Sequence, residues 1–306
     1  MNKISSLSSL YDIKVLKYVY KNSVLILDTD KGKYVIKEKK SNRKKEIYDY
    51  LLSRGFPFFL YPESYINDKY EVYPYINEVS TLKEEKAVHL INVLSELQIR
   101  TTTYKEYTLD EIKELYEEKN KQIDTLINYY NDLEEAFSTK VYPSSYERLY
   151  LVNASKVYNT LLYSKELVEK WYLSVIQNKK KRLVLLHNHL SLDHFLDCKD
   201  AKIINFDYAN YGSPVYDFSY FYKKHYYELD MFSLFKIYQH RYTYTYEEML
   251  LLFIQIIIPI KVKLTNNNLE NTLAFHKLIS YIDITRDFIL KQQEKQKKEN
   301  NDKLSK

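Results

Sequence analysis

The sequence has 306 residues, with 46 lysines and arginines against 41 aspartates and glutamates, which gives a formal net charge of +5. Hydrophobic residues make up 45% and charged residues 28% of the chain, as is usual for a folded protein with a buried core. Basic residues are interspersed with acidic ones, which argues against a nucleic-acid-binding protein. Only three glycines are present, which disfavours a glycine-rich phosphate loop.

The cysteine content and the apolar runs bear on location. The single cysteine, Cys198, excludes an intramolecular disulfide and metal sites built from cysteine pairs. It fits a reducing compartment, so a cytoplasmic location is expected. Residues 1–10 contain no continuous apolar segment of the signal-peptide kind. The longest apolar run, residues 249–260, is too short to span a bilayer, so we expect a buried helix there and no membrane insertion.

The first forty residues predict β structure. Residues 13–20 and 33–39 alternate polar and apolar side chains, and residues 23–28 form an apolar run. The sequence Asp30-Lys31-Gly32-Lys33 suits a hairpin turn between the second and third of these strands.

A helix and two more strands follow. Residues 42–54 have helical spacing of apolar side chains and are followed by Gly55, a favourable residue just after a helix. Residues 64–67 and 70–76 are extended stretches. The expected order of the first eighty residues is therefore β-β-β-α-β-β.

Beyond about residue 80 the periodicity becomes helical. Short strands are expected on either side of one polar region, and the last residues form a polar, basic stretch that predicts a frayed helix end or a disordered tail. The expected helices are 81–101, 109–136, 155–177 and several from 216 onward, the expected strands are 182–186 and 202–206, and the charged tail is 291–306.

Residues 185–222 carry the most informative motif. Kinases use a frame His-x-Asp-x-x-x-x-Asn, followed after a hairpin by a metal-binding aspartate. His187 holds the first position of this frame, and His189 stands where the catalytic aspartate belongs. His194 stands at the metal-binding asparagine position, and Asn205 at the second metal-binding aspartate position.

Two further stretches make the resemblance specific. Gly212–Phe218 (GSPVYDF) matches the sequence that follows the catalytic loop in aminoglycoside phosphotransferases and choline kinases, and Ile203–Tyr208 (IINFDY) matches wording found in kinase-like spore coat proteins of the CotS type. The chain therefore resembles the aminoglycoside phosphotransferase and choline kinase family of the protein-kinase-like superfamily.

The resemblance implies an α+β, bilobal protein-kinase-like fold, with a small β-rich N-lobe containing one main helix and a large, mainly helical C-lobe. The expected divisions are an N-lobe at 1–79, a C-lobe at 80–290 with a degenerate catalytic loop at 185–222 and a helical insertion at about 107–178, and a charged tail at 291–306.

Further site residues follow from the resemblance. Lys37, in Tyr34-Val35-Ile36-Lys37, resembles the lysine that holds nucleotide phosphates, and Glu46 is its expected ion-pair partner. The alternative is that Lys37 is one of many lysines in this stretch. His187 and Asp217 correspond to structural residues. The turn at residues 19–23 lacks the glycine that would let backbone approach a phosphate.

The replaced residues bear on the chemistry. Mg²⁺ prefers hard oxygen ligands, whereas Asn205 offers a neutral oxygen and His194 an imidazole nitrogen. His189 could accept a proton but supplies no negative charge. Asp193 and Asp207 lie close in sequence to these positions, so a rearranged metal site is an alternative. A transition-metal site formed by the three histidines is another.

The sequence thus predicts a pseudokinase: a kinase-fold protein that lacks normal phosphotransferase activity and acts as a binding or assembly factor, with the spore coat as the setting that the resemblance implies. The alternative is an ATP-dependent small-molecule kinase that phosphorylates hydroxyl groups, as aminoglycoside and choline kinases do, with a rearranged metal site. ATP and Mg²⁺ are the cofactors implied, and neither is established by the residues. The expected partner is a protein or a small molecule.

Overall fold

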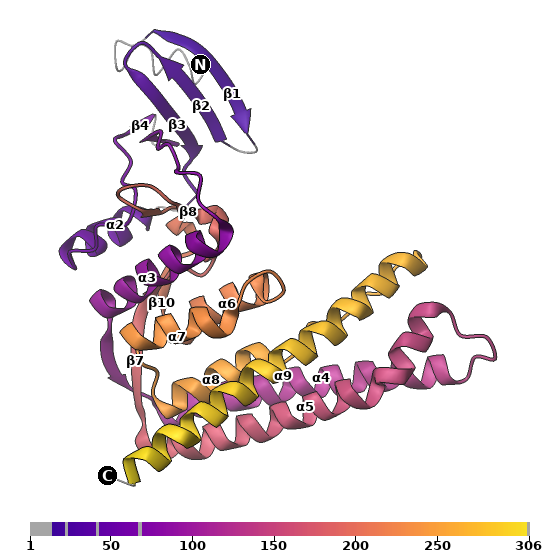
Figure 1. Ribbon diagram of the computed structural model, residues 1–306. Helices are drawn as coiled ribbons and strands as arrows, with labels where there is room; N and C mark the ends of the chain where they lie inside the picture. Colours follow the sequence, from indigo (N-terminus) through magenta and orange to yellow (C-terminus); the bar gives the residue numbers. More distant parts are fainter. Residues whose placement is uncertain (1–13, 22–23, 41–42, 67–68, 305–306) are drawn as a thin grey trace. The chain divides into compact units, whose positions relative to one another are not determined.

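The computed structural model describes residues 14–21, 24–40, 43–66 and 69–304, and side chains at several positions from 296 onward are not described. The chain forms two compact units (Figure 1). The first comprises Met1–Thr101 and Leu185–Tyr211, and the second Thr102–Val184 and Gly212–Lys306. The motif segment up to residue 211 therefore belongs to the unit that contains the N-terminal sheet. The sequence-based boundary at residue 79 stays a prediction.

An antiparallel five-stranded sheet forms the start of the first unit, in the order β1-β2-β3-β5-β4. The strands are β1 (Val15–Lys21), β2 (Val24–Thr29), β3 (Gly32–Glu38), β4 (Ser64–Ile66) and β5 (Tyr70–Pro74). Its buried apolar side chains form one cluster, made of Leu25, Leu27, Ile36, Ile66 and Val72. The β2–β3 hairpin confirms the predicted turn, with Gly32 at a φ of 131° that other residues rarely adopt.

Two helices and a small hairpin complete the first unit. Helix α2 (Lys44–Ser53) ends before Gly55, whose φ of 65° confirms the predicted helix stop. Helix α3 (Lys83–Thr101) buries a continuous stripe of leucine and isoleucine side chains. The hairpin joins β8 (Phe195–Leu196) to β9 (Lys202–Ile203), flanked by 3-10 turns at Leu192–His194 and Phe206–Tyr208.

The second unit is mainly helical. Figure 1 shows α4, α5 and α9 running side by side as long rods, and α5 also contacts α8. Strand β6 pairs antiparallel with β7, and β7 and β10 each continue along the chain from one unit into the other. The elements are β6 (Thr103–Glu106), α4 (Leu109–Ser138), α5 (Ser145–Asn178), β7 (Lys180–Leu186), β10 (Asn210–Gly212), α6 (Val215–His225), α7 (Met231–Arg241), α8 (Tyr246–Ile257) and α9 (Asn268–Leu304).

The predicted fold class is confirmed, because an antiparallel N-terminal sheet precedes a larger, mainly helical part in the order β-β-β-α-β-β and then helices. The expected strand at 202–206 is wrong beyond Ile203, because Asn205 has a left-handed backbone (φ 76°) that breaks the extended conformation. The charged segment from residue 291 continues helix α9 as far as Leu304.

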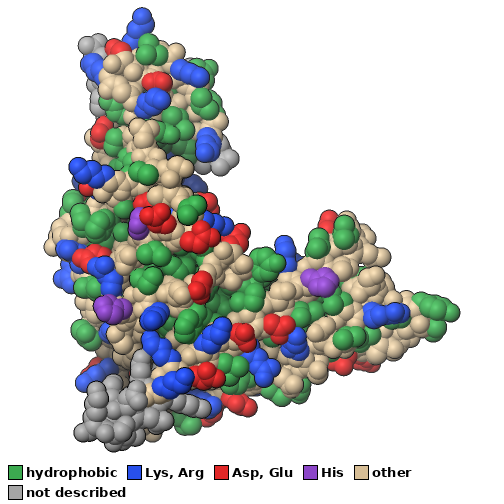
Figure 2. Space-filling model, viewed as in Figure 1, with side chains coloured by type: hydrophobic (Ala, Val, Ile, Leu, Met, Phe, Trp, Pro, Cys, Tyr) green, Lys and Arg blue, Asp and Glu red, His purple; other side chains and the backbone are tan. Residues whose placement is uncertain are grey.

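The surface of the second unit carries mixed charge. On the face visible in Figure 2, blue and red side chains lie interspersed over the long helices. Within the described residues, no helix combines the length and the apolar character needed to cross a membrane. The apolar run at 249–260 instead forms most of the buried helix α8.

Candidate functional site

The site is built inside the first unit, starting from the register of two strands. Strand β3 pairs with β5 so that Lys37 lies directly opposite Glu71. Directly opposed residues in an antiparallel pair project to the same face. The Glu71 side chain is 1% exposed and its Oε2 accepts a hydrogen bond from the Tyr73 hydroxyl at 2.8 Å. A buried acidic group therefore lies beside the lysine that the sequence singled out.

The first residue of α2 supplies a second lysine. The Lys44 side chain is 2% exposed, and its Nζ lies 2.7 Å from Glu71 Oε2 and 2.6 Å from Asp207 Oδ1. A cation at a helix N-terminus is disfavoured by the helix dipole, and burial of a charge costs free energy unless it is paired. The two carboxylates provide the pairing, so Lys44 is held in place by acids from two other segments.

A left-handed residue brings Asp207 into the same cluster. Asn205 has φ 76° and ψ 46°, a conformation that asparagine adopts more readily than most residues, and the 3-10 turn Phe206–Tyr208 follows it. Asp207 Oδ2 then lies 2.5 Å from Lys37 Nζ, with the Asp207 side chain 2% exposed. Lys37 also donates a hydrogen bond to Asn205 Oδ1.

The pKa values follow from this pairing. Burial raises the pKa of Asp207, but hydrogen bonds from Lys37 and Lys44 outweigh it and hold that pKa below its ordinary value. Burial and repulsion from Lys44 lower the pKa of Lys37, while its hydrogen bond to Asp207 opposes the shift. Asp207 is therefore ionised at neutral pH, as an anion held between two ammonium groups.

A chain of hydrogen bonds continues from Asn205 to the histidines. His194 Nδ1 lies 2.7 Å from the His189 carbonyl oxygen, which can only accept, so we assign the ring proton to Nδ1. His194 Nε2 then accepts from the Asn205 amide nitrogen at 3.1 Å. With its oxygen toward Lys37, Asn205 uses both ends of its amide within the protein.

His187 is fully buried at the base of this loop. Its Nε2 donates to the Ile204 carbonyl at 2.8 Å, and its Nδ1 accepts from the His189 backbone N–H at 3.3 Å. Burial is the main cause that lowers the pKa of His187 to about 3, so the ring is neutral. Both ring nitrogens are thus engaged with backbone. This bonding fits the structural role implied by the resemblance and leaves no nitrogen for the three-histidine metal site.

The residues present do not fit Mg²⁺, the ion that the kinase fold implies. Each oxygen of Asp207 already lies within 2.6 Å of an ammonium nitrogen. Asn205 and His194 are bonded to each other, and His194 offers nitrogen rather than the oxygen that Mg²⁺ prefers. Across the described part of the chain, no group of three or more histidine, cysteine, aspartate or glutamate side chains could hold a metal ion.

The predicted residues are brought together in part. Lys37, His194, Asn205 and Asp207 form one connected network. Their convergence does not come from the alternation of side chains along an extended strand. It comes from the left-handed turn at Asn205.

Other predicted residues lie outside this network. Glu46 is exposed on α2, and Lys37 contacts Asp207 and Asn205 instead. Asp193 is exposed, and the His189 ring lies against the edge of Tyr208, with 4.6 Å between ring centroids. Asp217 is fully buried in α6 of the second unit. In the turn at 19–23, residues 22 and 23 lie outside the described residues, so that prediction is not addressed.

Sequence reasoning missed Lys44 and Glu71. A signal for Lys44 was present, because the buried positions of α2 are Lys44, Ile47, Tyr48 and Leu51, at helical spacing. A lysine on the apolar stripe of a helix needs a buried partner. Glu71 had a comparable signal, since it stands between Tyr70 and Val72 in β5, at the start of a run of three buried residues.

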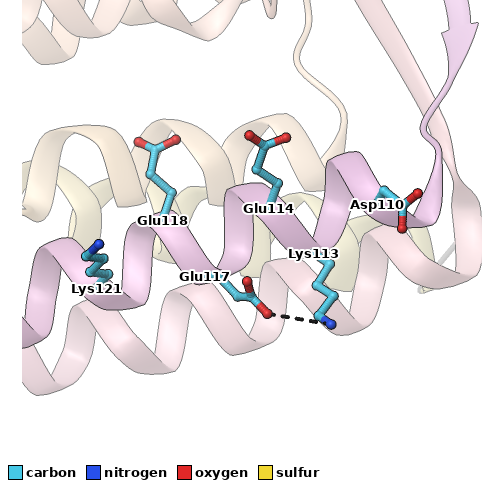
Figure 3. A pocket seen from close by; sticks show the side chains of 6 residues that line it. All are labelled: Asp110, Lys113, Glu114, Glu117, Glu118 and Lys121. Atoms are coloured by element: carbon cyan, nitrogen blue, oxygen red, sulfur yellow. Dashed lines mark ion pairs between the residues drawn. The ribbon is translucent and has the colours of Figure 1, made fainter.

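An open hollow lies on the second, mainly helical unit. Figure 3 shows that it follows α4, with the carboxylates of Glu114 and Glu118 pointing to the same side of the helix. It has a volume of about 490 Å³ and is lined by four acidic residues and two lysines, Asp110, Lys113, Glu114, Glu117, Glu118 and Lys121. Only Lys113 and Glu117 form an ion pair among these six, at 3.8 Å. The hollow is therefore acidic and open.

Solved structures share this architecture. An aminoglycoside phosphotransferase from Alicyclobacillus acidocaldarius subsp. acidocaldarius matches with a TM-score of 0.70 over 96% of each chain, at 10% sequence identity. The chain therefore shares the fold of this protein. A spectinomycin phosphotransferase, solved with ADP and spectinomycin, matches with a TM-score of 0.54 at 13% identity, covering 94% of this chain and 97% of the other.

The remaining comparisons add less. A choline kinase from Streptococcus pneumoniae matches with a TM-score of 0.43 at 14% identity, covering 94% of this chain and 95% of the other. No family model and no curated protein sequence matches the chain. At these identities, the phosphotransferase likeness concerns the fold.

Proposed function

We propose that this chain is a phosphotransferase-fold binding protein that does not carry out the Mg²⁺-dependent phosphoryl transfer of that fold. The observation that carries the proposal is the position of Asp207 between the ammonium groups of Lys37 and Lys44. Phosphoryl transfer depends on metal ions that neutralise the phosphates and on a residue that positions the attacking group. Here Asp207, the carboxylate two residues beyond Asn205, is already paired with two ammonium groups of the protein.

The histidine at the position of the catalytic aspartate supports the same proposal. His189 stands at the catalytic aspartate position, and its backbone is engaged on both sides, with its carbonyl accepting from His194 and its N–H donating to His187. An imidazole there adds no negative charge to orient a hydroxyl nucleophile. The loop is thus organised by internal hydrogen bonds, which suits a scaffold that recognises a partner or a ligand.

The proposed biological setting rests on the sequence alone. A role in assembly, with the spore coat as its setting, rests on the wording of Ile203–Tyr208, and no comparison supports it. A cytoplasmic location likewise rests on the cysteine usage of the chain. Both stay predictions.

The second candidate function is an ATP-dependent small-molecule kinase with a rearranged metal site. The comparisons favour it over an assembly role, because the matching proteins are phosphotransferases, and one was solved with ADP and spectinomycin. The acidic hollow along α4 is a further observation in its favour, since carboxylates such as Glu114 and Glu118 would suit an amine-bearing acceptor.

Thermal unfolding with ATP, with and without Mg²⁺, separates the two candidates. A ligand at about one hundred times its Kd adds roughly 2.7 kcal/mol of stability, which raises the midpoint by several degrees. We expect no Mg²⁺-dependent rise and no ADP formation with aminoglycoside or choline acceptors. A Mg²⁺-dependent rise together with acceptor-stimulated ADP formation would establish the kinase and overturn the binding-protein proposal.

Matched variants give this experiment its control. Lys37→Met should abolish any response to nucleotide that uses the network, because Lys37 is the partly exposed cation of the cluster. Lys40→Met, which changes an exposed lysine three residues further on, should leave the response unchanged. Equal responses in both variants would show that ATP binds elsewhere on the chain.

A further inference from the structure

Four charged side chains from four segments form a closed, neutral cluster in the first unit. Lys37 from β3, Lys44 from α2, Glu71 from β5 and Asp207 from the turn after Asn205 contribute two positive and two negative charges. Three of the four side chains are no more than 2% exposed, and Lys37 is 16% exposed. Because charges buried this deeply must be balanced, the cluster has no net charge left for an additional ion.

We propose that the Lys44 ammonium is a built-in replacement for the metal ion at Asp207. The inference rests on the proposed function and deepens it, since it says which group has taken over the neutralising role. Lys44 Nζ lies 2.6 Å from Asp207 Oδ1 and 2.7 Å from Glu71 Oε2, so it bridges two carboxylates from different segments, as a bound cation would.

Charge balance explains why the ammonium and a divalent cation exclude each other. Adding a divalent cation to the neutral cluster would leave a buried net charge of +2, and the same cation would meet two ammonium groups at close range. Removing the charge of Lys44 gives the cluster a net charge of −1. Lys37 alone would then face the carboxylates of Asp207 and Glu71, and a divalent cation would leave a net charge of +1 instead of +2.

The geometry also changes what restoring the kinase residues should do. His189→Asp, His194→Asn and Asn205→Asp together return the expected side chains to the motif. In this protein they leave Lys44 in place, with its ammonium on Asp207. The triple variant alone should therefore gain little affinity for metal, and the triple variant combined with Lys44→Gln should gain much more.

The test uses metal alone, without nucleotide, on the full chain. Wild type, Lys44→Gln and the double variant Lys44→Gln/Asp207→Asn are titrated with MnCl₂ and MgCl₂, with thermal unfolding and calorimetry as readouts. We expect no response in wild type and at least about tenfold tighter Mn²⁺ binding in Lys44→Gln. The double variant should lose this gain, because it lacks the Asp207 carboxylate.

The other outcomes are also decisive. Mn²⁺ binding by wild type as tight as by Lys44→Gln, or an equal gain in the double variant, would overturn the inference. If Lys44→Gln folds only when Mn²⁺ is present, the inference is supported. If it folds in neither condition, wild-type calorimetry decides: heat of Mn²⁺ binding overturns the inference, and its absence supports it. Because no nucleotide is used, failure here is separate from the detection of phosphotransfer, which would overturn the proposed function.

Discussion

Buried acids of the two units differ in whether they also cap a helix. In the second unit, Glu248 accepts from the backbone N–H of Thr245 at 2.9 Å, and the Thr245 hydroxyl accepts from the Glu248 N–H, which forms a capping box at the start of α8. In the first unit, Glu71 lies in strand β5 and Asp207 in a 3-10 turn, and both pair with lysine side chains from other segments, as Glu248 also pairs with Arg182. A buried acid in a capping box stabilises the start of its own helix. The charged cluster of the first unit instead joins side chains from separate segments.

The start of helix α5 gives a second example of a buried acid in the second unit with a capping role. Glu147 forms a capping box with Ser144 at the start of α5, and Lys140, four residues before Ser144, pairs with Glu147 at 2.5 Å. These partners lie within seven residues of one another in sequence. Local acids of this kind can be predicted from a Ser/Thr-x-x-Glu pattern, whereas the first unit's cluster joins residues up to 170 positions apart.

The largest effect is expected from breaking the first unit's cluster. Lys44→Met leaves Glu71 and Asp207 buried with too little compensating charge, which should cost about 3–5 kcal/mol of the free energy of unfolding. Urea denaturation measures this loss. Lys45→Met, an exposed neighbour on the same helix, should change it by less than about 0.5 kcal/mol. Equal small losses in both would show that the cluster contributes nothing to stability.

A smaller effect is expected at α8. Glu248→Gln weakens the capping box and the pairing of Arg182 with Glu248, and should cost about 2 kcal/mol. The loss should appear in urea denaturation, while the metal and nucleotide titrations match wild type. The control is Glu135→Gln, at an exposed position of α4. A change in ligand response on Glu248→Gln would contradict the purely structural role given to this pair.

The smallest effect is expected at Glu147 and depends on pH. Burial raises its pKa, but hydrogen bonds from Lys140 and Ser144 outweigh this and lower the pKa to about 2, from an ordinary value of 4.5. A carboxyl with a lowered pKa in the folded state adds stability above its unfolded pKa and loses it as the pH falls through the folded value.

Glu147→Gln should therefore cost about 1 kcal/mol at neutral pH, and its difference from wild type should shrink as the pH falls from about 4.5 toward 2. Thermal unfolding across this range measures the change, with Glu135→Gln on exposed α4 as control. A difference that stays constant with pH would show that the carboxylate charge of Glu147 has no part in the cap.

The order of helices and strands could be predicted from the sequence, because the local periodicity of apolar residues and the turn residues indicate it. The hairpin at Gly32 and the helix stop at Gly55 each follow from a backbone conformation that glycine adopts easily. His194, Asn205 and Asp207 were found through their spacing in a known frame, and Lys37 through its resemblance to a phosphate-holding lysine. Whether they meet, and with which partners, depends on the three-dimensional structure.

The positions of Glu71 and Lys44 in the site depend on strand register and on where helix α2 begins, rather than on a local sequence pattern. The pairing of β3 with β5 sets Glu71 opposite Lys37, and a shift by one residue would turn Glu71 to the other face. The start of α2 places Lys44 toward the site and leaves Glu46 exposed. A motif centred on residues 187–207 contains no information on either, so the sequence predicted Glu46 as the partner of Lys37.

The bridging position of Lys44 also constrains the mutational paths open to this chain. An aspartate gained at position 205 has little to bind while the ammonium of Lys44 remains on Asp207. The same aspartate becomes useful once that lysine is gone. On the proposed role of Lys44, the benefit of each substitution depends on which one comes first: an aspartate at position 205 gains a metal ion to bind only in a chain that has already lost Lys44.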